Sequence, residues 1–128
     1  TKQHSISVSG LFMLGGNIIG DEIDLSKEED HLECLAILAS EDMITAPKGK
    51  NAHDGVPVMD GIIGKCPKKS TTVAIIQGGN HAGFGHYGPQ TYPVPDGERT
   101  ISHEEQQNET IRHLASYIQK IKKRHKRK

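Results

Sequence analysis

An acid and a histidine each follow an apolar run in this 128-residue chain, and this pair is the main candidate for chemistry. Asp42 follows the run LECLAIL at 32–38, and His81 follows the run TTVAII at 71–76 and a pair of glycines. If both runs are parallel strands, their carboxyl ends lie at one edge of the sheet and the two side chains meet there. A carboxylate bonded to one ring nitrogen of histidine leaves the other nitrogen as a general base. The alternative is that the two side chains never touch.

Three apolar segments are expected to form the strands that carry this pair. Residues 6–14 first alternate between apolar and small or polar side chains and then become continuously apolar. Residues 71–76 are mainly β-branched. The length of residues 32–38 suits a buried strand, although periodicity alone leaves a helix open. Residues 48–69 contain many Gly and Pro residues, and a short helix is expected only at 56–63. Residues 78–99 form a long loop of the kind that often carries function.

A helix over residues 102–122 is the clearest element of the sequence. Ser102 and Glu105 have the spacing of a capping box, in which each side chain bonds the backbone amide of the other residue. The spacing of apolar residues predicts one buried stripe, formed by Ile111, Leu114, Ala115, Ile118 and Ile121. The order of elements predicts an α/β fold with about three parallel strands and a C-terminal amphipathic helix.

Composition indicates one small domain with an acidic body and a basic end. Only 34% of the residues are hydrophobic and the mean hydropathy is −0.56, so the expected core is small. Residues 122–128 (KKRHKRK) hold six of the 16 Lys and Arg residues, so the rest of the chain is acidic. Nucleic-acid binding is therefore not expected of the fold itself. The basic end is expected to be a frayed helix end, with nucleic-acid binding or a nuclear address as the alternatives. Without a visible signal peptide or membrane span, the default expectation is a cytoplasmic location and no membrane partner.

Two motifs follow the third apolar run: GGNHAGFGHYGPQ at 78–90, which contains His81, and ISHEEQQ at 101–107. Together they resemble a branch of the α/β-hydrolase superfamily, the single-domain hydrolases related to dienelactone hydrolase. The resemblance continues in SGLFMLGG at 9–16, which is similar to the sixth strand of that family. LAILASED at 35–42 is similar to its seventh strand and acid loop, although Ala39 and Met43 replace the usual glycines. The resemblance implies a partial α/β-hydrolase fold with His81 and Asp42 as catalytic residues.

The resemblance also implies a pocket, a substrate class and a missing part. Asn80, Phe84, His86 and Tyr87 are the expected pocket residues beside His81. The family nucleophile is a serine in G-x-S-x-G, and this motif does not occur in the sequence. Residues 1–121 are therefore expected to be the C-terminal portion of a hydrolase domain, followed by a basic tail at 122–128.

Two functions remain open at this point. The first is carboxylic ester or lactone hydrolysis by a Ser-His-Asp mechanism on a small-molecule substrate, with the nucleophile elbow lacking here. The second is a catalytically inactive remnant that acts as an interaction module, with a second chain completing the sheet.

No cofactor is expected, and the histidines do not have the spacing of a metal site. His81 and His86, with His53, His103 and Asp42 or Asp96, are the conceivable ligands, but no H-E-x-x-H motif is present. Cys34 and Cys66 are too few for a disulfide framework, and Cys34 is expected to be a small buried hydrophobe. Neither glycine pair has the spacing of a phosphate-binding loop.

Overall fold

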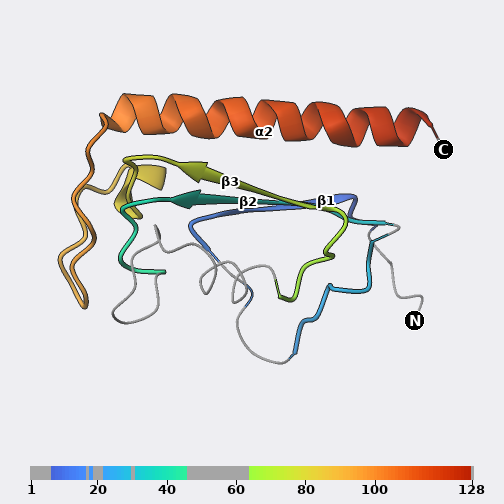
Figure 1. Ribbon diagram of the computed structural model, residues 1–128, viewed down its shortest axis with the longest axis horizontal. Coiled ribbons are helices and arrows are strands. Elements are labelled where there is room, and N and C mark those ends of the chain that lie inside the picture. The colour runs from blue at the N-terminus through green and yellow to red at the C-terminus, as the bar shows by residue number, and fades with distance from the viewer. Residues whose placement is uncertain (1–6, 17, 19–21, 30, 46–63, 128) are drawn as a thin grey trace, which may run out of the picture.

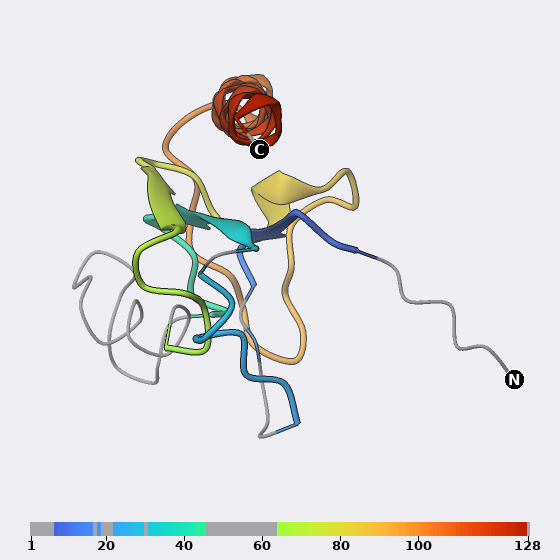
Figure 2. The same cartoon turned by 90° about the vertical axis from the view of Figure 1, so that its right-hand side faces the viewer.

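A three-stranded parallel sheet with one long helix on one face forms the described part of the chain (Figures 1 and 2). The computed structural model describes residues 7–16, 18, 22–29, 31–45 and 64–127. The elements, in chain order, are β1 (Gly10–Leu14), β2 (Glu33–Ala39), β3 (Thr71–Ile76), the 3₁₀ turn η2 (Ala82–Phe84) and α2 (His103–Lys126). The predicted α/β class, with three parallel strands and a C-terminal helix, is confirmed.

The strands begin where a neighbour is available to pair with them. The bounds of β3 match the prediction, and β2 lies one residue later than the predicted 32–38. β1 begins at Gly10 and not at residue 6, because Gly10 pairs with Glu33, the first residue of β2. Residues 7–9 are not strand, and residue 6 lies outside the described residues, as does the helix expected at 56–63.

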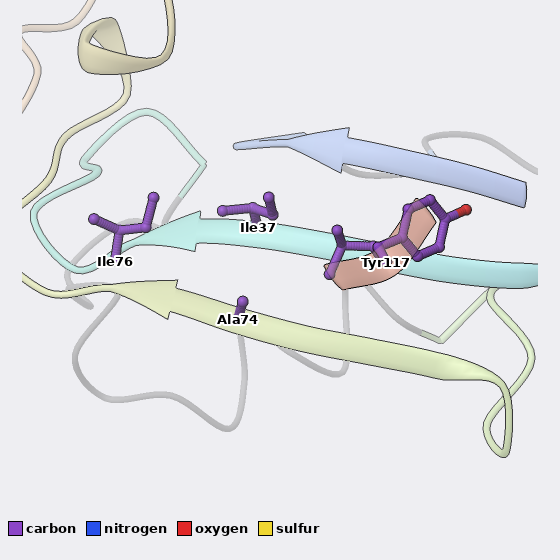
Figure 3. Close-up of a cluster of buried hydrophobic side chains, with 5 residues drawn as sticks. Ile37, Ala74, Ile76 and Tyr117 are labelled. Carbon is purple, nitrogen blue, oxygen red and sulfur yellow. The ribbon is translucent and has the colours of Figure 1, made fainter. Parts of the chain in front are cut away.

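The core lies mainly between the sheet and α2. On this face Leu35 and Ile37 from β2, Ala74 and Ile76 from β3, and Tyr117 from α2 form one buried cluster (Figure 3). The opposite face buries a smaller set, which comprises Ala36 and Leu38 and, near the start of β2, Leu32, Cys34 and Cys66. Every residue of β2 is buried, as expected for a central parallel strand with cover on both faces.

The helix packs on the sheet through a face that matches only part of the stripe that its apolar spacing predicts. Leu114 and Ile121 pack against the core, but Ala115, Ile111 and Ile118 are exposed, the last two at 60% and 48%. The buried side of α2 carries Gln106, Thr110 and Tyr117. Polar side chains of α2 bond backbone groups of the sheet and its loops, and these bonds fix the rotation of the helix.

Basic residues beyond the predicted helix end continue α2 to Lys126. Arg124 anchors this part, because its Nη1 lies 3.0 Å from Glu33 Oε1 and its Nη2 donates to the Glu29 carbonyl at 3.0 Å. Lys120 Nζ lies 3.4 Å from the other oxygen of the Glu33 carboxylate. The first part of the basic segment is therefore helix tied to the start of β2.

Replacing Tyr117 with phenylalanine is expected to lower the free energy of unfolding by about 1–2 kcal/mol. The Tyr117 hydroxyl donates to the Glu33 carbonyl at 2.8 Å in a buried setting, and phenylalanine would leave that carbonyl without this donor. Urea denaturation measures the difference. Ile118→Ala on the exposed side of α2 is the control and is expected to change stability by less than about 0.5 kcal/mol. An equal loss in both variants would contradict the observed helix orientation.

Candidate functional site

The acid and the histidine leave the sheet at the same edge, because β2 and β3 run in the same direction. The two segments after these strands are bonded to each other. Gly78 N donates to Ser40 Oγ at 2.8 Å, and Glu41 N donates to the Gly79 carbonyl at 2.8 Å. Gly78 has a φ of 81°, which lets the chain turn sharply at this point. The carboxyl ends of β2 and β3 thus present their following residues side by side.

Asp42 and His81 meet across this edge, as the sequence predicts for a dyad. His81 Nδ1 lies 3.0 Å from Asp42 Oδ2, and Asp42 is only 1% exposed. A carboxylate can only accept, so this contact places a proton on Nδ1 and leaves Nε2 unprotonated in the neutral ring. The His81 side chain is 24% exposed, and Nε2 has no hydrogen-bond partner within the described residues. Nε2 is therefore free to accept a proton from a bound group.

The buried carboxylate is oriented by three further donors from its own loop. Asp42 Oδ1 accepts from Ile44 N at 2.8 Å and Thr45 N at 3.0 Å, and Oδ2 accepts from Thr45 Oγ1 at 2.8 Å. With the bond from His81, both oxygens are satisfied, which a buried charged group requires. The acid is thus fixed in one rotamer by its hydrogen bonds and holds the imidazole ring in place.

The histidine loop is fastened to α2 through Gln106, a fully buried side chain in the first turn of the helix. Gln106 Oε1 accepts from Asn80 N at 3.1 Å, and its Nε2 donates to the Asn80 carbonyl at 2.8 Å. Gln106 also packs so closely on Gly83 that a Cβ there would overlap its amide. The capping box at Ser102 and Glu105 is formed as predicted and sets the start of this helix. The position of His81 thus depends on the N-terminal turn of α2.

Asp96 ties the acid loop to the histidine loop from the long segment before α2. Its Oδ2 accepts from Ala82 N at 2.9 Å, and its Oδ1 accepts from Met43 N at 3.3 Å and Gly97 N at 2.8 Å. Ala82 directly follows His81, and Met43 directly follows Asp42. The carboxylate of Asp96 thus fixes the separation of the two dyad residues from outside the dyad.

The four predicted pocket residues take different positions around this loop. Asn80 is buried, accepts from Gly83 N and donates to the Gly97 carbonyl, each at 2.9 Å. Phe84 packs against the core between the sheet and α2. His86 stacks edge-to-face on His103 with ring centroids 4.5 Å apart, and Tyr87 is 67% exposed.

A cavity of about 680 Å³ is lined mainly by the loop between η2 and α2. Asn80 and His86 line it, together with Asp96, Arg99 and His103. Neither His81 nor Asp42 is among its lining residues.

Thr45, Asp96 and Gln106 support the dyad, and the sequence reading assigns none of them such a role. The spacing of Asp42 and Thr45 is a local signal, since Asp side chains often accept bonds from residues two or three positions later. Gln106 and Asp96 carry no comparable local pattern, because their partners lie far away in the sequence.

No group of three or more His, Cys, Asp and Glu side chains that would suit a metal ion occurs among the described residues. His53, one of the conceivable ligands, lies outside them. Within the same residues, no helix is both long and apolar enough to cross a membrane.

Comparison with known proteins agrees with the observed sheet and helix. Residues 1–108 match the family described as the alpha/beta hydrolase family, and this match spans most of the chain. No curated protein and no solved structure gives a significant match. The matched region contains all three strands, Asp42, His81 and the first turn of α2. The chain therefore belongs to the alpha/beta hydrolase family.

Proposed function

We propose that this chain supplies the His–Asp part of a Ser-His-Asp hydrolase that acts on small carboxylic esters or lactones, in the dienelactone-hydrolase-related branch of the family. The observation that carries the proposal is the 3.0 Å contact between His81 Nδ1 and the buried Asp42 carboxylate. This contact leaves Nε2 in the position and tautomer that a general base needs. Membership of the family makes a hydrolase-like function the best-supported reading of that dyad.

In the proposed reaction His81 moves a proton twice. Nε2 accepts the proton of a serine hydroxyl while the serine oxygen attacks the ester carbonyl. The resulting imidazolium is stabilised by Asp42, and Nε2 then gives its proton to the departing alcohol oxygen. A water molecule releases the acyl group by the same two proton transfers. Asp42 keeps its charge throughout, because its other hydrogen bonds already hold it as a carboxylate.

The serine is proposed to come from a polypeptide segment outside this sequence that pairs with β1. Two observations support this position. Among the described residues β1 is bonded to β2 on one side, and no described strand pairs with its other edge. Gly15, just after β1, lies against both Asp42 and Phe84, since a Cβ there would be 3.2 Å from Asp42 Oδ2. The end of a strand added beside β1 would therefore lie next to the dyad.

Reconstitution tests this proposal directly. The chain is co-expressed with a family polypeptide that carries the strand, G-x-S-x-G and helix but ends before its own acid. Hydrolysis of a p-nitrophenyl ester and labelling of the serine by a fluorophosphonate are then measured. Both signals are expected only when the two polypeptides are present together. A complex that forms without either signal would exclude the catalytic role and leave the interaction role described next.

A second function, an interaction module without catalysis, is favoured by one surface. We define the open-edge surface as Phe12, Ile111 and Ile118, which are 51%, 60% and 48% exposed. Gly10 lies against Tyr117 of α2, and Leu14 packs against the core cluster between the sheet and α2. Phe12 lies between these two residues, so its side chain is on the helix face of β1. Gln107, one helical turn before Ile111, donates to the carbonyl of Gly83 in η2. The turn η2 lies on the same side of α2 as β1 (Figure 2), so this face of the helix is turned toward β1.

Charge substitutions in the open-edge surface separate this role from a passive exposed surface. Phe12→Asp and Ile118→Asp are each expected to weaken association with the complementing polypeptide at least about tenfold, because each buries a charge. Val94→Asp is the matched control, since Val94 is 53% exposed in the loop between η2 and α2, outside this surface. Calorimetry measures the dissociation constants. Equal affinities for all three variants would mean that this surface takes no part in binding.

A further inference from the structure

Two cysteines that the proposed site does not use lie together on the face of the sheet opposite α2. Cys34 is near the start of β2, and Cys66 lies in the turn that precedes β3. Both are thiols outside any disulfide, and both are 0% exposed. They belong to one cluster with Leu32, against which Leu11 and Met13 pack. Each thiol affects the pKa of the other, so the two side chains are near neighbours within this cluster.

The backbone on both sides of this pair is held by hydrogen bonds. Cys34 N donates to the Ser70 carbonyl at 2.9 Å, and Ser70 Oγ donates to the Leu32 carbonyl at 2.6 Å. Thr71 Oγ1 donates to the Pro67 carbonyl at 2.5 Å, which fixes the turn that carries Cys66. The two backbone segments that carry Cys34 and Cys66 are therefore held side by side in the folded chain.

We propose that Cys34 and Cys66 form a reversible disulfide when the protein meets a peroxide or a disulfide oxidant. With hydrogen peroxide, one thiolate attacks an oxygen, the O–O bond breaks, and a sulfenic acid and, after protonation of the leaving hydroxide, water result. The second thiolate attacks that sulfur, the S–S bond forms and the S–O bond breaks with release of a second water. Two electrons pass from the thiols to the peroxide. With glutathione disulfide, two exchange steps release two molecules of glutathione.

The surroundings of the pair determine how this modification acts. Burial raises the pKa of Cys34 to about 11 and also raises that of Cys66, so thiolates are scarce in the closed structure and local opening must precede oxidation. The pair lies at the amino ends of β2 and β3, whereas the dyad lies beyond their carboxyl ends. The disulfide would therefore change stability and leave the geometry of the dyad intact. It would close a loop that contains Asp42.

Equilibration with glutathione tests the proposal on the full chain. The fraction of disulfide is measured by alkylation and intact mass, and peptide mapping identifies the linked cysteines. If the disulfide acts by restricting the unfolded chain, its formation is favoured by folding. The equilibrium constant for disulfide formation with glutathione is then expected to be about 100-fold larger in the folded chain than in concentrated urea. A ratio of one or less would overturn the proposal. So would the recovery of only glutathione adducts or sulfinic acids from the folded chain.

Thermal unfolding provides a second readout that does not depend on the urea reference. Oxidation is expected to raise the midpoint by about 10 °C, and dithiothreitol is expected to reverse the change. Each protein is compared with its own reduced form, because Cys34→Ala or Cys66→Ala opens a cavity in the core. The single variants should show no increase with oxidant. The same increase in either variant would overturn the proposal.

Discussion

Replacing His81 with alanine is expected to lower kcat/KM for a p-nitrophenyl ester about a thousandfold in the reconstituted complex. The substitution removes the atom that takes the serine proton, and removal of one member of a Ser-His-Asp triad has effects of this size or larger. His81 is only partly buried, and its described side-chain hydrogen bond is to Asp42. The fold should therefore survive the substitution, and circular dichroism checks that it does.

His113 provides the matched control for this experiment. It lies on α2, it is 33% exposed at the side chain, and its nearest charged partner is Glu109 at 3.9 Å. His113→Ala is expected to leave kcat/KM within about twofold, because it touches neither dyad residue. If His81→Ala retained half of the activity, or if both variants lost it equally, His81 would not be the base.

Asp42→Asn is expected to reduce kcat about a hundredfold or more with a smaller change in KM. The substitution removes the charge that stabilises the imidazolium. The amide nitrogen of asparagine donates only, and it would face another hydrogen-bond donor. Thr45 donates to both oxygens of Asp42 through its amide and hydroxyl, so one of these bonds or that of His81 must be lost. Measurement of both constants distinguishes this effect from a general loss of substrate affinity.

The contact between Asp42 and His81 is predictable from sequence because each residue lies a few positions after the end of its own strand. An apolar run that ends in a polar residue identifies both a buried parallel strand and the residue at its carboxyl end. Once β2 and β3 are adjacent and parallel, Asp42 and His81 have to lie near one another. The capping box at Ser102 is equally local, and the structure forms it as predicted.

The rotation of α2 is not predictable in this way, since polar contacts over long sequence distances set it. The apolar spacing selects Ile111 and Ile118, and both are exposed. Gln106 and Tyr117 are buried instead, because they bond the backbone of Asn80 and of Glu33. A hydrophobic pattern predicts which residues are buried because they are apolar. It does not predict the burial of a polar side chain whose hydrogen-bond partners lie in distant parts of the chain.

Gln106→Leu is expected to lower the free energy of unfolding by about 3 kcal/mol, the largest stability effect proposed for this chain. Leucine is similar in size but would leave the Asn80 N–H and C=O without partners inside the protein. Each unpaired backbone group in a buried position costs about 1–3 kcal/mol, and two are created at once. The loss is concentrated next to His81, so amide hydrogen exchange over residues 78–85 should accelerate more than exchange in β2.

Gln107→Leu separates this specific effect from a general effect on the first turn of α2. Gln107 is the next residue, it is only partly buried, and it donates to one backbone carbonyl, that of Gly83, at 2.7 Å. Only one hydrogen bond is lost, against two for Gln106→Leu, so the expected loss is about 1 kcal/mol. If the two leucine variants lost equal stability, the bonds from Gln106 to Asn80 would not be what holds the histidine loop. A larger loss for Gln106→Leu, with faster exchange around His81, is the result that the buried amide pair predicts.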